Sequence, residues 1–276
     1  KTISQKTYFR KARYMMKPLS SQAAFISGGS RGIGLAIAKQ LAGDGADVMI
    51  SGRDNQQIQK AIAEIEAETS SVVRGYAGDL ATPEGCNAAF AAHLDAFQKC
   101  NILIHSAGAT KGGVFPDQPD GDYLDGFALK FHAGVRLSRL FWPSLKANSG
   151  TVIMIIGSAA RTPDPKFMVG GSVNAALANY TKALAGQGLV DDVNVNWIHP
   201  GQTETDRLTG LLATRAKDED KSIEDVMKER IKAEGIRRLG QPEDVSGIVG
   251  FLCRAEARHI HGTGISVDGG ATKGYF

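Results

Sequence analysis

Several glycines lie at close spacing in the segment S-G-G-S-R-G-I-G, which spans residues 27–34. A short apolar run, residues 23–27, precedes this segment, and apolar residues at four-residue spacing follow it, as in a helix. Glycines let backbone N–H groups approach a pyrophosphate closely, and the start of a helix adds partial positive charge. The segment therefore predicts a dinucleotide-binding turn between a strand and a helix, with a purely structural turn as the alternative.

The end of the second predicted strand, Ser51-Gly52-Arg53, bears on which dinucleotide would bind. A site selective for NAD carries Asp or Glu there, because the carboxylate accepts a hydrogen bond from the ribose 2′-hydroxyl. Gly52 has no carboxylate to repel a 2′-phosphate, and Arg53 can pair with one. Ser30 and Arg31 lie on the same side of the turn. These residues predict NADP(H) rather than NAD(H), although Arg53 could also be a solvated residue at a helix start.

The rest of the sequence alternates between short apolar runs and longer helix-prone segments. The predicted strands are residues 23–27, 47–51, 72–76, 101–104, 151–156, 193–198 and 264–267. The helices predicted between them include residues 55–69, 83–98, 123–146, 172–186 and 242–254. This pattern indicates an α/β fold, a doubly wound parallel β-sheet with helices on both faces (a Rossmann fold). Residues 206–238 are charged, helix-prone and placed after a strand end, where we expect a substrate lid.

Composition and charge narrow the classes of partner. The chain has 276 residues, of which 42% are hydrophobic and 22% charged, as in a folded globular protein. We expect one domain at residues 21–276. Residues 1–20 hold six Lys and Arg side chains and no acid, and without them the net charge is about −3. We therefore expect no nucleic-acid partner, and we interpret residues 1–20 as a basic extension, either a remnant of a targeting segment or a leader.

No membrane span or metal site is predicted. The longest apolar run, Val152–Ile156, is far shorter than the about 18 residues that cross a bilayer. The three cysteines are widely spaced, which predicts neither a disulfide framework nor a metal site. They favour a reducing compartment, so we expect a cytoplasmic protein. The expected partner is a small-molecule substrate.

Taken together, these features resemble the short-chain dehydrogenase/reductase family over residues 22–270. The segments that carry the resemblance are Ser27–Gly34, Asp79-Leu80, His105–Gly108, Ser158, Pro200–Thr205, Arg238–Asp244 and Val267–Gly270. The resemblance implies an NADP(H) site formed by Gly28, Ser30, Arg31, Gly32, Ile33, Gly34, Arg53, Asp79, Leu80, Ser106, Ala107, Gly108, Pro200, Gly201, Thr203 and Thr205. It also implies a homo-oligomer, a tetramer or dimer, formed through the helices at 123–146 and 172–186.

The sequence departs from the family at the pair that carries its chemistry, a Tyr-x-x-x-Lys motif. In the family the Tyr hydroxyl exchanges a proton with the substrate oxygen, and the Lys lowers the Tyr pKa. Aligned on Ala175-Ala176-Leu177, the sequence has Gly170 at the Tyr position and Asn174 at the Lys position. Lys130 matches the family's Asn on the preceding helix, so two residue types are exchanged across one site. We expect Lys130 to lie within hydrogen-bond reach of Asn174, an intervening water or the nicotinamide ribose, with a solvated helix residue as the alternative.

The sequence is compatible with three functions. The first is an NADP(H)-dependent oxidoreductase for a carbonyl, alcohol or activated C=C substrate, with Ser158 binding the substrate oxygen and Lys130 supplying charge or a proton. The others are a nucleotide-binding protein without turnover, acting as a sensor or partner subunit, and a non-redox lyase or hydrolase.

Several other charged or titratable residues have two interpretations. We expect His105 to line the pocket structurally and His132 to pack or face solvent. Lys166 is either an acid or an exposed loop residue. In the predicted lid, Arg207, Arg215 and Lys217 would suit an acidic or phosphorylated substrate, or form a solvated face.

Overall fold

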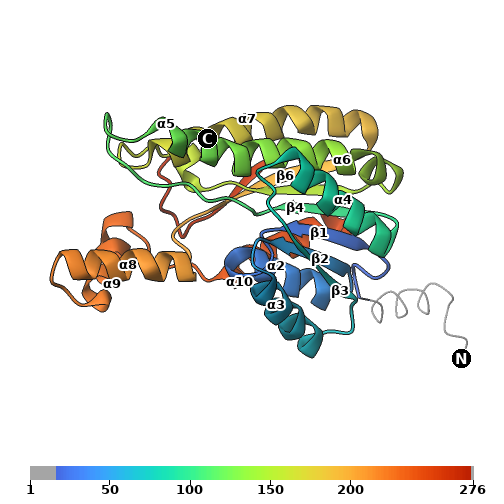
Figure 1. Ribbon diagram of the computed structural model, residues 1–276, viewed down its shortest axis with the longest axis horizontal. Helices are drawn as coiled ribbons and strands as arrows, with labels where there is room; N and C mark the ends of the chain where they lie inside the picture. The colour runs from blue at the N-terminus through green and yellow to red at the C-terminus, as the bar shows by residue number, and fades with distance from the viewer. Residues whose placement is uncertain (1–16, 275–276) are drawn as a thin grey trace, which may run out of the picture.

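The computed structural model describes residues 17–274. Its centre is a seven-stranded parallel sheet in the order β3-β2-β1-β4-β5-β6-β7, with helices on both faces (Figure 1). The strands are β1 (Ala23–Ser27), β2 (Asp47–Gly52), β3 (Val73–Ala77), β4 (Ile102–His105), β5 (Thr151–Ile155), β6 (Asn194–Pro200) and β7 (Gly264–Val267). The predicted doubly wound α/β fold is therefore confirmed.

The strand order reverses direction between β1 and β4, which lie next to each other at the centre of the sheet. Their pairing places Ser27 beside His105, so the carboxyl ends of both strands meet at one edge. In open α/β sheets, ligands bind in the crevice outside the carboxyl ends of the strands at such a switch point. The glycine turn that follows Ser27 lies in this position.

Two hydrophobic clusters hold the helices on the sheet. On one face lie α2 (Gly32–Gly43), α3 (Asn55–Glu68) and α10 (Pro242–Leu252), and on the other α4 (Pro83–Phe97), α6 (Ala133–Ala147) and α7 (Met168–Asp191) (Figure 1). All five residues of β1 and all five of β5 are buried, as expected for strands covered on both faces. Phe25 and Phe141, both fully buried, pack with ring centroids 5.0 Å apart.

The long helix expected over residues 123–146 is interrupted. It consists of α5 (Asp120–Gly126), a π-helical segment η1 (Phe127–His132) and then α6. Within this segment, the carbonyl of Lys130 accepts a hydrogen bond from His105 Nε2 at 2.8 Å. Single π-helical turns inside α-helices occur frequently at functional sites, and this one contains Lys130.

Residues 206–238, the expected lid, form two helices. They are α8 (Asp206–Asp218), capped by Thr205, and α9 (Ile223–Glu234), capped by Ser222. The two helices pack on each other through a small apolar cluster of their own and extend to one side of the sheet (Figure 1). Their side chains therefore stabilise the pair locally, and only the start of α8 approaches the glycine turn.

Of the predicted basic extension, residues 1–16 lie outside the described residues. Leu19, which belongs to the rest of it, is fully buried, and its N–H donates to the Asp44 carbonyl at 2.9 Å. In the described part of the chain, no helix is long and apolar enough to cross a membrane. Residues 17–274 also contain no group of three or more His, Cys, Asp and Glu side chains that could hold a metal ion.

Candidate active site

The glycine turn lies directly against the loop that follows β4. Gly28 has a φ of +68°, which favours glycine, and a Cβ atom at this position would lie 2.9 Å from the Ala107 Cα. Ser27 Oγ accepts hydrogen bonds from the N–H groups of Ser106 and Ala107, each at 3.1 Å. The predicted pyrophosphate turn and the predicted Ser106–Gly108 contact are thus brought together at one edge of the sheet.

The Pro200–Thr205 segment reaches the same turn from β6. Gly32 has a φ of +55°, and a Cβ atom there would lie 3.2 Å from Thr205 Cγ2. Arg31, at the start of α2, is exposed and makes no side-chain capping bond. The first N–H groups of a helix lack intrahelical partners. A glycine cradle next to the start of α2 therefore fits a pyrophosphate group.

The ribose end of the site also fits the predicted cofactor. A Cβ atom on Gly52 would lie 2.9 Å from the Ser30 side-chain oxygen, so no acidic side chain fits there without moving Ser30. Arg31 and Arg53 are exposed, and the latter follows β2 directly. The two guanidinium groups and the Ser30 hydroxyl are suitable donors for a 2′-phosphate.

The two residues of the predicted adenine contact have different surroundings. Asp79 is exposed, and its Oδ1 accepts a hydrogen bond from the N–H of Ala81 at 3.0 Å. The side chain of Leu80 is buried in the hydrophobic core. Asp79 is thus the accessible side chain of this pair.

Lys130 extends toward the cofactor side of the sheet. A Cβ atom on Gly108 would lie 2.8 Å from Lys130 Cδ and 3.3 Å from its Cε, so the lysine stem lies on this glycine. Burial, followed by the positive charge of Arg207, lowers the pKa of Lys130 to about 8. A lysine with this pKa can donate a proton as the ammonium and accept one as the neutral amine near neutral pH.

Asn174 makes no direct hydrogen bond with Lys130, which was one of three contacts expected for that lysine. It is buried, and its Oδ1 accepts a hydrogen bond from the Gly157 N–H at 2.8 Å, while its Nδ2 donates to the Gly170 carbonyl at 2.7 Å. The hydrogen bond from the Gly157 N–H connects the end of β5 to α7, and the second one lies within α7. Gly157 precedes Ser158, which opens the short helix η2 (Ser158–Ala160), so Asn174 holds the backbone immediately before Ser158.

The space beside Gly170 is filled by an aromatic ring that the sequence did not indicate. A Cβ atom on Gly170 would lie 1.9 Å from Phe167 Cε1 and 2.1 Å from its Cζ. Phe167 precedes α7 and is half-buried. A side chain at position 170 would therefore need the ring of Phe167 to move.

His105 has a structural role at the floor of the site, as expected. It is fully buried, its Nδ1 accepts a hydrogen bond from Ser27 Oγ at 2.9 Å, and its Nε2 donates to the Lys130 carbonyl at 2.8 Å. Burial lowers the pKa of His105 to about 4, so the ring is neutral at pH 7. It connects the glycine turn with the π-helical segment that carries Lys130.

The other charged candidates differ in the contacts that their side chains make. Arg207 Nη2 donates to the Thr110 carbonyl at 2.7 Å, beyond Gly108 in the loop after β4. Arg215 instead pairs with carboxylates of α8 and α9, among them Glu219 at 2.6 Å. Lys166 and Lys217 are exposed, as is His132, whose ring packs edge-on against Phe131.

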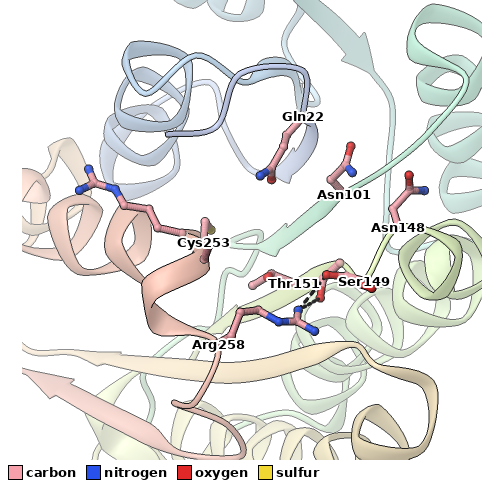
Figure 2. A pocket seen from close by; sticks show the side chains of 10 residues that line it. Gln22, Asn101, Asn148, Ser149, Thr151, Cys253 and Arg258 are labelled. Carbon is pink, nitrogen blue, oxygen red and sulfur yellow. Dashed lines mark hydrogen bonds between the residues drawn. The ribbon is translucent and has the colours of Figure 1, made fainter. Parts of the chain in front are cut away.

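A hollow lies at the edge of the sheet opposite to the glycine turn (Figure 2). It has a volume of about 240 Å³ and is lined by residues at the amino ends of β1, β4 and β5, including Gln22, Asn101 and Thr151. Two arginines line it, Arg254 and Arg258, and the latter donates hydrogen bonds to the carbonyls of Ser149 and Gly150. Figure 2 shows Arg258 in this hollow, where it connects the segment after α10 to the loop before β5.

Comparisons with known proteins agree with this geometry. A family model described as enoyl-(acyl carrier protein) reductase matches residues 28–272. Mouse dehydrogenase/reductase SDR family member 4 (Mus musculus) is 31% identical over 255 residues, which cover 92% of this chain and 88% of that protein. The oxidoreductase YvaG of Bacillus subtilis, itself uncharacterized, is 29% identical over 264 residues, covering 94% and 98% of the two chains.

A solved structure gives the same result at the level of the fold. The L-sorbose reductase of Gluconobacter frateurii, complexed with NADPH and L-sorbose, superposes with a TM-score of 0.90 at 28% identity. The superposition covers 94% of this chain and all of that one. The matched family model, the relatives and the sheet order together show that the chain belongs to the short-chain dehydrogenase/reductase family.

Proposed function

We propose that this protein is an NADP(H)-dependent oxidoreductase that acts on a carbonyl, alcohol or activated C=C substrate. The glycine cradle, the exposed Arg31 and Arg53, and the small residue Gly52 support NADP(H) as the cofactor. The NADPH in the similar L-sorbose reductase supports the same choice. When bound, the cofactor supplies or accepts the hydride.

The observation that carries this proposal is the position of Lys130. Its stem lies on Gly108, in the loop beside the glycine turn, and its lowered pKa suits proton transfer near neutral pH. In the reduction direction, Ser158 hydrogen-bonds the substrate oxygen, and the Lys130 ammonium donates the proton that this oxygen takes up. Asn174 acts through Ser158, by fixing the N–H of Gly157.

We also propose that Gly170 and Asn174 occupy the positions of the family's Tyr and Lys, so the proton donor comes from another helix. Of the expected lid, the start of α8, which carries Arg207, would then border the substrate. A homo-oligomer through α6 and α7 is supported by Leu189 and Val190 at the end of α7, which are 73% and 79% exposed. The three buried, unpaired cysteines support a cytoplasmic location.

One observation favours a second function, nucleotide binding without turnover. The ring of Phe167 fills the space beside Gly170, where a family-type Tyr would begin. A sensor or partner subunit transfers no proton, so the lack of space for a Tyr side chain would not impair its function. The two functions differ in whether NADPH is consumed.

The deciding experiment measures binding and turnover on the same preparation. NADPH affinity is determined by fluorescence titration, and NADPH oxidation is then followed with a panel of ketones, oxo acids, aldehydes and enones. Oxidation that depends on both substrate and Ser158, tested with Ser158→Ala, supports the oxidoreductase. Tight NADPH binding with no oxidation on any substrate supports the second function instead.

A further inference from the structure

Two cationic side chains reach the loop after β4 from different elements. Lys130, in the π-helical segment, lies on Gly108, and Arg207, in the first turn of α8, donates Nη2 to the Thr110 carbonyl at 2.7 Å. Their charges act on each other, since Arg207 contributes to the lowered pKa of Lys130. Both charges therefore lie on the side of the site where the substrate would bind.

Neither cation is balanced by a carboxylate within residues 17–274, for no ion pair of Lys130 or Arg207 occurs there. The next cation along the same loop, Lys111, is paired with Asp122 at 2.8 Å. Lys130 is held beside the exposed Arg207, and like charges near one another are unfavourable unless an anion joins them. The arrangement is thus complementary to a negatively charged ligand.

We propose that the substrate carries an anionic group, a carboxylate or phosphate, that Arg207 binds next to the carbonyl served by Lys130. This inference rests on the proposed oxidoreductase function. Because Lys130 lies on Gly108 and Arg207 donates to the Thr110 carbonyl, two residues further along the same loop, we infer a short spacing between the anionic group and the reacting carbonyl, as in 2-oxo and 3-oxo acids. A planar guanidinium suits such a group because it can donate two parallel hydrogen bonds.

The reaction balances with the anionic group unchanged. A hydride from NADPH forms a C–H bond at the carbonyl carbon, and the π electron pair of the C=O bond moves to oxygen. That oxygen takes the proton of the Lys130 ammonium. The carbonyl is reduced to a hydroxyl, NADPH is oxidised to NADP⁺, and Lys130 regains its proton from water.

Matched substrates test the proposal. 2-Oxobutanoate and 3-oxobutanoate are compared with their uncharged carboxamides and with a phosphate-bearing ketone, dihydroxyacetone phosphate. In the unmodified protein, kcat/KM is expected to be higher for the anionic member of each pair by about 10- to 100-fold, as for a charge-assisted hydrogen bond. Arg207→Gln should abolish this preference, chiefly through KM, and leave NADPH affinity unchanged.

The control variant is Arg215→Gln, on the same helix, because its guanidinium is already paired with Glu219 and Glu229. It should retain the preference for anionic substrates. Equal turnover of acids and amides would overturn the proposal, and so would equal losses in the two variants. Weaker NADPH binding in Arg207→Gln would also overturn it, because Arg207 would then be a cofactor contact.

Binding separates this proposal from the proposed function. Calorimetric titration of the NADP⁺-loaded protein with 2-oxobutanoate and with its carboxamide needs no turnover. Binding of the acid alone, lost in Arg207→Gln, supports the anion site even if no substrate is reduced. Absence of acid binding in a protein that reduces neutral ketones refutes the anion site and keeps the oxidoreductase.

Discussion

If Lys130 donates the proton, the activity in the reduction direction should fall as pH rises through about 8. Burial and the nearby Arg207 lower the pKa of Lys130 from 10.5 to about 8. With this pKa, about nine-tenths of the lysine is charged at pH 7 and about one-tenth at pH 9. The rate should thus decrease about tenfold per pH unit above 8, while in the alcohol-oxidation direction it should rise over the same range.

Two substitutions distinguish the role of Lys130 as a proton donor from the packing of its side chain. Lys130→Met keeps a long apolar chain on Gly108 but removes the donor, so kcat should fall by about 10²- to 10⁴-fold. Lys130→Arg keeps the charge, but a guanidinium does not lose its proton below pH 12, so its residual activity should show no fall near pH 8. Lys217→Met, at an exposed lysine of α8, is the matched control and should behave like the unmodified protein.

The assay is NADPH oxidation at saturating cofactor from pH 6 to 10, with the fold of each variant verified by its thermal midpoint. The reasoning fails if the unmodified protein shows a flat profile between pH 7 and 9.5. It also fails if Lys130→Met retains the descending limb near pH 8, since another group would then donate the proton.

Arg53→Ala should weaken NADPH binding by about 10- to 100-fold and NADH binding little, because a charge-assisted contact to the 2′-phosphate is lost; equal losses in fluorescence titrations would contradict this. Gly170→Tyr should lower the thermal midpoint because the Phe167 ring occupies the space of the new Cβ, and adding Phe167→Ala should restore part of the loss. Asn174→Ala leaves the Gly157 N–H and the Gly170 carbonyl without their partner, so urea unfolding should show a loss of about 1–3 kcal/mol. An unchanged midpoint in urea would show that these two hydrogen bonds are readily replaced.

The fold could be predicted closely because its signals are local. Each strand is a short apolar run buried on both faces, and each turn between strand and helix is marked by polar or glycine residues. Helix α7 begins at Met168 rather than Ser172, since nothing in the sequence marks its start. The π-helical segment could not be predicted from local signals, and it coincides with a tertiary contact, the hydrogen bond between the Lys130 carbonyl and His105, which is distant in sequence.

The site, like the fold, could be predicted where the signals are local and not where they depend on tertiary contacts. The glycine turn and Ser51-Gly52-Arg53 could be interpreted from sequence because each acts through its own backbone or charge. Of the three contacts expected for Lys130, the direct hydrogen bond to Asn174 is absent, because that amide is turned toward Gly157 and Gly170. The contacts with a water or with the nicotinamide ribose stay predictions. The ring of Phe167 could not be placed from the sequence, since a glycine leaves a volume without specifying which neighbour fills it.

The hydrogen-bonded position of His105 gives the protein a spectroscopic reporter of its own. Both ring nitrogens are engaged and the ring is fully buried, so the Nε2 proton is shielded from exchange with water. A shielded imidazole proton of this kind should give a resolved downfield resonance in proton NMR spectra recorded in water. Because one ring nitrogen contacts the glycine turn and the other the segment carrying Lys130, this single resonance would register the binding of a cofactor and the movement of the π-helical segment together.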